Sequence, residues 1–545
     1  MRGQGIDFYY TFLSNVKKEG MVMNEDQRRK LGQLFVFGFN GTTVTPGIKQ
    51  MIQEHFIGNI ILFSRNIKNK KQLFELTTQL QRLAKEAGHE RPLAICVDQE
   101  NGAVRRLGDD TTMLPGAMLL GATNEPSYAK EVGKLTAKEM TALGVNWNLA
   151  PVVDINNNPE NPVIGVRSFG ENPVKVAAFS QAIMQGMQDE GVMTTLKHFP
   201  GHGDTNVDSH HALPIIEHSS KRLFEVELVP FQACIKAGAD MVMSAHVVFP
   251  AFESNSTLPA TLSKQVITDL LRQTLGFDGV VVTDCLEMDA IAGTVGTAQG
   301  AFQAFQAGAD LLMVSHRFER QQETIDVFTK KLVTDQSINK RLEDSYKRVI
   351  QLKERYLTWA QLPQVDGIDG VGSLEHRERA ASIYEKGITA IGERRLDETK
   401  PVLVFYPETS KQSLAEDPRK GERPIEAVLD KQLAAFVPIK ERELDRYLTL
   451  AASYEQIIVA SRSMEEGSFQ QIFIRELVQR GHEPIVIGTQ NPYDYGFIPE
   501  NLTYVSTYEH TEPAIKAAFN FLYEKGEAQG VFPVTMHRKG GGVGI

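Results

Sequence analysis

The stretch from residue 196 to residue 214 brings together side-chain types that could do chemistry. It holds four histidines, two aspartates and one lysine, and its glycine and proline residues prevent a helix there. The apolar run before it, 192–196, is typical of a buried strand, so Lys197 and His198 are expected where that strand ends. Ionisable groups on a loop that a rigid strand holds are typical of a catalytic site. The alternative is a solvated surface loop with scattered histidines.

A nucleophile and a proton carrier can both be proposed from position and type. Asp284 directly follows an apolar run and is expected at a strand end, where a carboxylate can attack an electrophilic sugar carbon. The leaving oxygen then needs a proton, and His210 is the best candidate, because Asp208 can orient its ring and stabilise its charged form. Histidine exchanges protons near neutral pH. The alternative is that Asp208 caps a turn and His210 lies on the surface.

Further charged side chains are expected to bind the substrate. Carboxylates and cationic side chains make paired hydrogen bonds to vicinal hydroxyls and acyl oxygens. A lone arginine or lysine is usually a solvated surface charge, but each of these residues follows a predicted strand end. They are Asp98, Arg106, Arg167, Lys197 and His198.

A metal site is the obvious rival to this interpretation. His198 and His202 are four residues apart, which would place both on one face of a helix. Pro200 and Gly201 exclude that helix, and no His-x-His pair follows the first predicted strand. We therefore expect neither a catalytic metal nor any other cofactor.

Strand-like runs alternate with helix-like segments through the first part of the chain. Eight such runs occur, at 34–38, 58–63, 93–97, 145–153, 192–196, 241–244, 280–283 and 311–314. The alternation predicts parallel strands with crossover helices, and eight units predict a (β/α)8 barrel, with a doubly wound open sheet as the competitor. In a barrel, catalytic groups follow the strand ends at one face, and five of these runs lead directly into ionisable groups.

A second α/β pattern follows a connecting region. Residues 358–375 are rich in glycine and proline and indicate a linker, and 376–391 is predicted to be helical. Four further strand-like runs predict a smaller αβα sandwich domain. The expected division is a catalytic barrel at 21–357, a linker with a helix at 358–396 and the second domain at 397–545. Met21 and Met23 are candidates for the natural start, in which case residues 1–20 are an upstream extension, and the true start stays open.

Composition excludes several classes of protein. The formal net charge of −10 argues against a nucleic-acid surface or a basic membrane patch. The three cysteines, Cys96, Cys234 and Cys285, lie in apolar surroundings, so no disulfide framework is expected and a reducing compartment is favoured. The N-terminal region has neither a signal peptide nor a membrane anchor, so we expect a cytoplasmic protein.

The motifs around these residues match a known family. They are Lys197-His198-Phe199-Pro200-Gly201-His202-Gly203-Asp204-Thr205, Asp208-Ser209-His210, Leu213-Pro214, Val97-Asp98-Gln99-Glu100, Arg167-Ser168-Phe169-Gly170 and Val282-Thr283-Asp284. This set resembles the signature of glycoside hydrolase family 3 β-N-acetylglucosaminidases of the NagZ type. The resemblance spans about 25–360, and the C-terminal part is similar to the αβα domain of two-domain members. Two departures are Asn101, where glycine is usual, and Thr283, where serine is usual.

The resemblance implies a function and a set of roles. Asp284 matches the nucleophile and Asp208 with His210 the acid/base pair, while Asp98, Arg106, Arg167, Lys197 and His198 match residues that hold N-acetylglucosamine (GlcNAc). It implies a retaining exo-β-N-acetylglucosaminidase that acts on peptidoglycan fragments (muropeptides) or related GlcNAc glycans. The partner is therefore a small carbohydrate, with no nucleic acid and no membrane. The aglycone and the oligomeric state stay open.

Two other functions are alternatives to this one. The first is a phosphorylase on the same scaffold, because a histidine acid/base carries no negative charge that would repel phosphate. The second is a non-catalytic sugar-binding protein. That alternative requires Asp284 or the Asp208–His210 pair to be missing, and all three residues are present.

Overall fold

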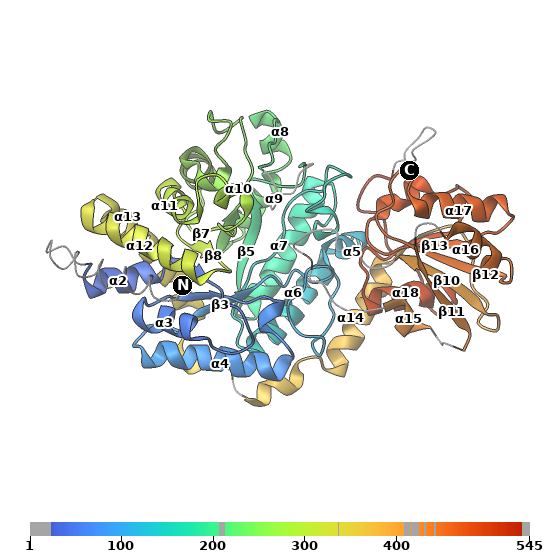
Figure 1. Ribbon diagram of the computed structural model, residues 1–545, viewed down its shortest axis with the longest axis horizontal. Helices are drawn as coiled ribbons and strands as arrows, with labels where there is room; N and C mark the ends of the chain where they lie inside the picture. The colour runs from blue at the N-terminus through green and yellow to red at the C-terminus, as the bar shows by residue number, and fades with distance from the viewer. Residues whose placement is uncertain are drawn as a thin grey trace, which may run out of the picture.

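The computed structural model describes residues 23–205, 213–335, 337–363, 365–407, 416, 424–429, 432–440 and 443–536. Figure 1 shows two α/β units side by side, the first coloured blue to yellow and the second orange to red. The first contains an eight-stranded sheet and the second a six-stranded sheet.

The first unit is a barrel of eight parallel strands. They are β1 (Phe35–Phe37), β2 (Asn59–Ile61), β3 (Ala94–Val97), β4 (Trp147–Asn148), β5 (Met193–Phe199), β6 (Met241–Ser244), β7 (Val280–Thr283) and β8 (Leu312–Val314). Their order is β7-β6-β5-β4-β3-β2-β1-β8, and a parallel bridge between Val282 and Leu311 brings the two ends of the sheet together. The predicted barrel is therefore confirmed, and the open sheet is excluded.

Helices surround this barrel, as the crossover connections require. They are α2 (Glu25–Gly32), α3 (Pro46–Glu54), α4 (Lys70–Glu86), α5 (Ala117–Ala122), α6 (Pro126–Ala142), α7 (Pro173–Asp189), α8 (Ser220–Glu225), α9 (Val229–Lys236), α10 (Asp289–Ala292), α11 (Thr297–Ala307), α12 (Phe318–Thr334) and α13 (Ser337–Tyr356). Residues Gln265–Thr274 form a π-helix between β6 and β7. The interior of the barrel is filled by buried apolar side chains such as Val36, Trp147, Met243 and Met313, so it is a packed core.

Three elements differ from their predicted lengths. Strand β4 is only two residues long, because the chain turns after Asn148 into a long loop. Strand β5 continues to Phe199, so Lys197 and His198 lie within the strand, and its register against β6 shifts between Leu196 and Phe199. The periodicity of residues 219–237 predicts a single helix, but they form two, because the chain turns around the buried Glu227.

The second unit is an αβα sandwich. Its strands are β9 (Thr389–Ile391), β10 (Val402–Pro407), β11 (Ala434–Ile439), β12 (Gln456–Ser461), β13 (Ile485–Gly488) and β14 (Tyr504–Ser506). Their order is β11-β10-β12-β13-β14-β9, and only β9 is antiparallel among these described strands. Its helices are α15 (Pro424–Val428), α16 (Leu444–Ala451), α17 (Phe469–Gln479) and α18 (Glu512–Leu522). The expected helix at 376–391 is wrong at its end, because α14 (Leu374–Gly387) stops and β9 begins.

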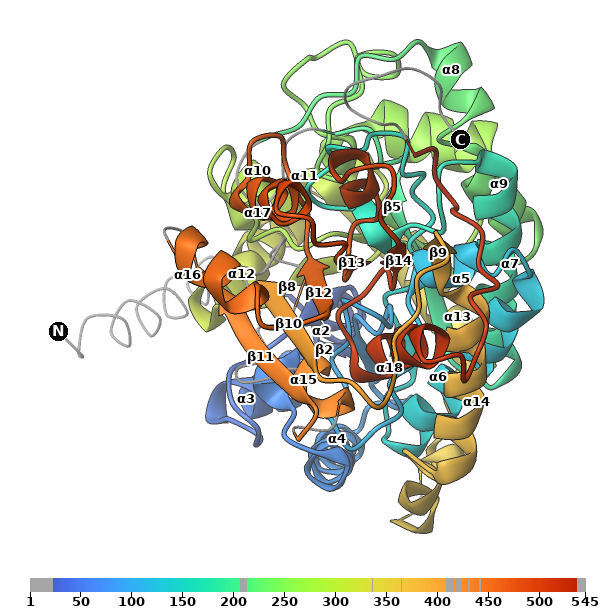
Figure 2. The same ribbon diagram turned by 90° about the vertical axis from the view of Figure 1, so that its right-hand side faces the viewer.

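The second unit packs against the loops that follow β3 and β4. The buried carboxylate of Glu509 accepts hydrogen bonds from the backbone N–H of Gly116 and the hydroxyl of Tyr384, both at 2.8 Å. The side chain of Asn156 donates to the hydroxyl of Tyr493 at 3.0 Å. Figure 2 shows the second sheet in front of the barrel. The domain limits at 357 and 396 stay a prediction.

The described helices include none that combines the length and the apolar character needed to cross a membrane.

Candidate active site

A network of four charged side chains lies at the C-terminal ends of β3 and β5 and in the loop after β4. Lys197 Nζ lies 2.7 Å from Asp98 Oδ1 and 2.6 Å from Glu100 Oε1. Arg167 donates to both oxygens of Glu100, at 2.8 and 2.9 Å. The fork of the guanidinium thus matches the carboxylate with two parallel bonds. The structure therefore brings together three of the side chains expected to bind substrate, Asp98, Arg167 and Lys197.

The four side chains of this network are largely buried. The side chains of Lys197, Glu100 and Arg167 are 3%, 6% and 7% exposed, whereas Asp98 is 17% exposed. Burial acts to raise the pKa of Glu100, but the positive charges of Arg167 and Lys197 hold it below its ordinary value. Burial acts to lower the pKa of Lys197, and Asp98 and Glu100 raise it. Glu100 and Lys197 therefore stay charged at neutral pH, and Asp98 offers more surface to a ligand than the other three side chains of the network.

The loop after β3 is folded around one glutamine. Gln99 Oε1 accepts hydrogen bonds from the backbone N–H groups of Arg106 and Leu107, at 2.8 and 3.2 Å. Asn101 has a φ of 70°, a conformation that asparagine tolerates better than most side chains. Asparagine in place of the usual glycine is therefore compatible with this backbone conformation. Arg106 is buried in the same loop.

His198 is oriented by a buried aspartate that follows β4. Asp154 Oδ2 lies 2.7 Å from His198 Nδ1, so that nitrogen carries the proton, and His198 Nε2 lies 3.5 Å from Arg167 Nη2. Asp154 also accepts the backbone N–H of His202 at 2.7 Å. Burial acts to raise the pKa of Asp154, but His198 and the hydrogen bonds lower it, so it stays ionised.

Asp284 lies at the end of β7, half-buried. Its Oδ1 accepts the N–H of Cys285 at 2.7 Å, and its own N–H donates to Ser244 O at 3.2 Å. The ring of His246 lies 3.0 Å from the carbonyl oxygen of Cys285. Thr283, the second departure, accepts the N–H of Met313 on its hydroxyl at 3.1 Å, a bond that serine could also make. The nucleophile candidate is thus held by rigid neighbours.

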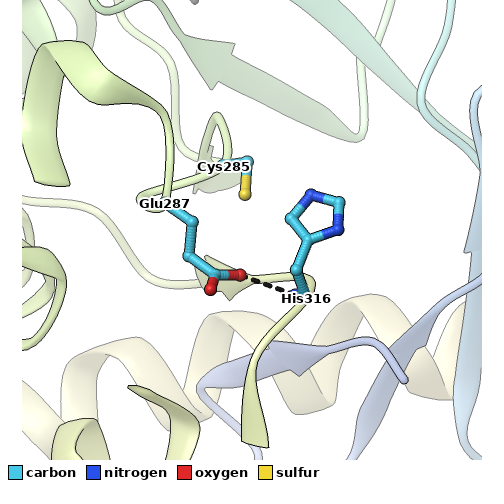
Figure 3. Close-up of side chains that lie close together, drawn as sticks. All are labelled: Cys285, Glu287 and His316. Carbon is cyan, nitrogen blue, oxygen red and sulfur yellow. Dashed lines mark hydrogen bonds between the residues drawn. The ribbon is translucent and has the colours of Figure 1, made fainter. Parts of the chain in front are cut away.

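Asp208 and His210 lie outside the described residues. The expected acid/base pair therefore stays a prediction. Glu287 is the other carboxyl group near Asp284 that could supply a proton. It accepts the backbone N–H of His316 at 2.6 Å (Figure 3). It also accepts the backbone N–H of Arg317 at 3.2 Å. Burial raises its pKa.

Two side chains of the site, Glu100 and Asp154, are not among those expected to bind substrate. Each follows a strand, as Asp98 does, which is the one signal in the sequence. Their contacts could not be predicted from sequence spacing. Glu100 pairs with Arg167 and Lys197, which lie on other elements, and Asp154 pairs with His198. Two clusters in the described part of the chain could hold a metal ion: Cys285 with Glu287 and His316, and Asp204 with His218 and Glu227.

A cleft of about 820 Å³ lies between the loop after β4 and the second unit. Arg167 lines it, so the cleft adjoins the charged network. Tyr493 and Phe497 also line it. Its carboxylates are Glu160, Glu416, Glu465 and Glu466; Glu416 is paired with Arg462, and the guanidinium of Arg167 with Glu100. The cleft therefore carries net negative charge.

The chain is similar to several known proteins. Residues 27–352 match the N-terminal domain of glycosyl hydrolase family 3. A β-hexosaminidase A of Pseudoalteromonas piscicida is 35% identical over 370 residues, which are 64% of this chain and 62% of that protein. The chain thus matches less than two thirds of that relative's length.

Two solved structures are also similar. A glycoside hydrolase family 3 β-N-acetylglucosaminidase from Paenibacillus sp. str. FPU-7 superposes with a TM-score of 0.85 and 39% identity, covering 94% of this chain and 99% of that one. NagZ from Neisseria gonorrhoeae, solved with N-trifluoroacetyl-D-glucosamine, has 31% identity and a TM-score of 0.55, covering 64% of this chain and 96% of that one.

The charged network yields a prediction about stability. Glu100→Gln leaves the buried cations of Arg167 and Lys197 without their shared carboxylate, and we expect it to lower the free energy of unfolding by about 3–5 kcal/mol. Glu25→Gln removes a carboxylate that is 65% exposed and paired with Arg29, and should cost less than about 1 kcal/mol. Urea unfolding followed by circular dichroism checks both variants. Equal losses of unfolding free energy in the two variants would contradict a stabilising role for the buried network.

Proposed function

This chain belongs to glycoside hydrolase family 3, and we propose that it is a retaining exo-β-N-acetylglucosaminidase that works through a covalent glycosyl-enzyme. The family and relatives at 35–39% identity support activity as a β-N-acetylhexosaminidase. The observation that carries the finer proposal is the buried network of Asp98, Glu100, Arg167 and Lys197, which presents one partly exposed carboxylate beside fixed cations. Such an arrangement suits the hydroxyl groups of one terminal sugar.

Asp284 is the nucleophile in this proposal. In the first step a carboxylate oxygen of Asp284 attacks the anomeric carbon, and the bond to the leaving oxygen breaks. The bond that Asp284 Oδ1 accepts from Cys285 supports this role, because it fixes the carboxylate without neutralising its charge. A rigid, charged nucleophile needs little reorganisation to reach the transition state.

His210 gives the proton to the leaving oxygen in the first step. In the second step it takes a proton from water, whose oxygen attacks the anomeric carbon and releases Asp284. Asp208 orients the imidazole. Glu287 is the competing proton donor, because burial raises its pKa although two backbone N–H groups and the nearby Arg320 oppose the rise.

Asp98, Lys197, Arg167, His198 and Arg106 bind the terminal GlcNAc. Asp98 accepts hydrogen bonds from sugar hydroxyls, and Lys197 and His198 are held in place by Asp98 and Asp154. Because these partners are fixed before the substrate arrives, binding costs little side-chain entropy.

The acidic cleft beside Arg167 supports a preference among substrates. Peptidoglycan fragments carry carboxylates next to GlcNAc, whereas chitin-type oligosaccharides are neutral. Glu465 and Glu466 are exposed in the cleft and repel an anionic aglycone. Both substrate classes are expected from the sequence, and the cleft favours the neutral class. Action in the cytoplasm, expected from the cysteine content, stays part of this proposal.

Phosphorolysis is the alternative outcome of the same chemistry. The uncharged form of His210 would admit phosphate in place of water in the second step. Analysis of the sugar product with and without phosphate separates the two: free GlcNAc under both conditions supports hydrolysis, and GlcNAc 1-phosphate supports the phosphorylase.

We expect Asp284→Asn or Asp284→Ala to lower turnover of an aryl β-GlcNAc substrate on the order of 10⁴-fold or more, because no covalent intermediate can form. Asp289→Asn, an exposed aspartate at the start of α10, should leave turnover nearly unchanged. The wild type should act weakly on the matching aryl β-glucoside. Near-normal turnover in a folded Asp284 variant would eliminate the nucleophile.

Loss of His210 should depend on the leaving group. A nitrophenolate leaves without a proton, whereas a sugar alkoxide does not, so His210→Ala should lose far more activity on GlcNAc disaccharides than on aryl glycosides. The glycosyl-enzyme should then accumulate, giving a burst, and azide should speed turnover. Asp208→Ala should show a milder form of the same pattern. Equal losses on both substrates, with no burst, would reduce His210 to a binding residue.

The acidic cleft predicts sensitivity to the charge of the aglycone. We expect kcat/KM for GlcNAc linked to a neutral sugar to exceed that for GlcNAc linked to N-acetylmuramic acid by about five- to tenfold at low salt, since a few carboxylates act through solvent. Added salt and the double variant Glu465→Gln/Glu466→Gln should both narrow the ratio. Glu86→Gln on α4 is the control. A ratio that neither change moves would contradict the role of the cleft.

A further inference from the structure

Three metal-binding side chains converge beside the proposed nucleophile. Cys285 and Glu287 come from the loop after β7, and His316 comes from the residues after β8 (Figure 3). Each offers one ligand atom, and these three atoms all lie within 4.8 Å of one another. The mechanism proposed above uses none of the three side chains.

We propose that Cys285, Glu287 and His316 form an inhibitory site for a thiophilic divalent cation of the Zn²⁺ class. The inference rests on the proposed function, because inhibition is expected only if Asp284 is the nucleophile. One thiolate sulfur, one imidazole nitrogen and one carboxylate oxygen make a ligand set that Zn²⁺ accepts with a fourth position for water. Mg²⁺ and Ca²⁺ prefer oxygen ligands, so the set discriminates against them.

Two of the three ligands are already held in place. The Glu287 carboxylate accepts the N–H of His316 at 2.6 Å, which ties the loops after β7 and β8 together. The His316 ring lies against Phe63, with ring centroids 5.2 Å apart and planes at 32°. The site is therefore partly assembled before a cation arrives, which lowers the entropy lost on binding.

The charges around the cluster set limits on affinity. Arg320 lies 3.7 Å from Glu287 and opposes a cation, as does Arg65, whose guanidinium lies over the Phe63 ring. Asp284 and Glu287 favour a cation. Burial raises the pKa of the Cys285 thiol to about 11, so forming the Zn–S bond releases the thiol proton to solvent. We therefore expect reversible binding that a chelator can undo.

Inhibition follows from the position of the cluster in the chain. Cys285 directly follows Asp284, and its N–H donates to Asp284 Oδ1 at 2.7 Å. A divalent cation on the Cys285 sulfur attracts the neighbouring carboxylate and weakens it as a nucleophile. The cation is no part of catalysis, so activity without metal is expected to be complete.

The test uses the full chain without an affinity tag, stripped with EDTA. Wild-type protein should keep full activity on the aryl β-GlcNAc substrate after stripping. Added ZnCl₂ should lower turnover saturably, MgCl₂ should not, and EDTA should restore the activity. His316→Gln should retain basal turnover, and its half-inhibitory Zn²⁺ concentration should rise about 10- to 100-fold. For Cys285→Ser, whose backbone N–H holds Asp284, the same rise is measured against that variant's own metal-free turnover. His218→Gln, in the other described cluster, is the matched control and should stay as sensitive as wild type.

Binding is also measured without activity. Titration of the stripped protein with CoCl₂ should give a thiolate-to-cobalt charge-transfer band that saturates at one Co²⁺ per chain. Cys285→Ser should abolish this band. Equal Zn²⁺ inhibition of wild type and both variants, or no band, would overturn the site. If the band appears but the enzyme lacks β-GlcNAc activity, the proposed function has failed and the site has not. If the band appears and Zn²⁺ leaves an active enzyme untouched, the inhibitory role is overturned.

Discussion

The structure depends on placing two cations inside a protein core and keeping both charged. Lys197 and Arg167 are almost completely buried, and each would be strongly destabilising alone. Glu100 contacts both, and Asp98 contacts Lys197, so the charges balance within one cluster. Because the four residues come from β3, β5 and the loop after β4, the cluster forms only when these parts of the barrel are in register. The same interaction thus assembles the site and selects the fold that carries it.

The second unit acts on this cluster from outside the barrel. Glu509 accepts the N–H of Gly116 in the segment after β3, and Tyr493 accepts a bond from Asn156 in the loop after β4. These are the two connections that carry the charged network, so the packing of the second sheet limits their freedom. A barrel alone would have to hold the same loops through its own contacts. This accounts for the direct contact of a second α/β unit with the face where the strands end.

Periodicity was enough to predict the barrel, because six of its eight strands are short, largely apolar runs of the kind that burial on both faces requires. It was not enough for β4, whose apolar pattern continues past Asn148 into a loop. The extension of β5 through Lys197 and His198 was also missed, since charged residues do not indicate a buried strand unless their partners are known. The four strand-like runs predicted for the second unit are 402–406, 456–460, 485–488 and 503–506, and β11 is not among them; it is a half-buried edge strand that contains Pro438. In the site, strand-end position predicted Asp98 and Lys197, but the role of Glu100 depends on a contact across three elements.

The strand order of the second sheet has a consequence for where the chain could be divided. Strand β9 precedes every other strand of that sheet in sequence and forms its only antiparallel edge in the described part, pairing Thr389, Ala390 and Ile391 with β14. Division at residue 397 would therefore leave β9 on the barrel fragment and uncover the backbone donors and acceptors of Tyr504–Ser506. An uncovered edge of buried residues is a template for intermolecular pairing. Autonomous folding of the C-terminal part thus requires the segment from α14 onward, and the connection between the units is itself a piece of the second sheet.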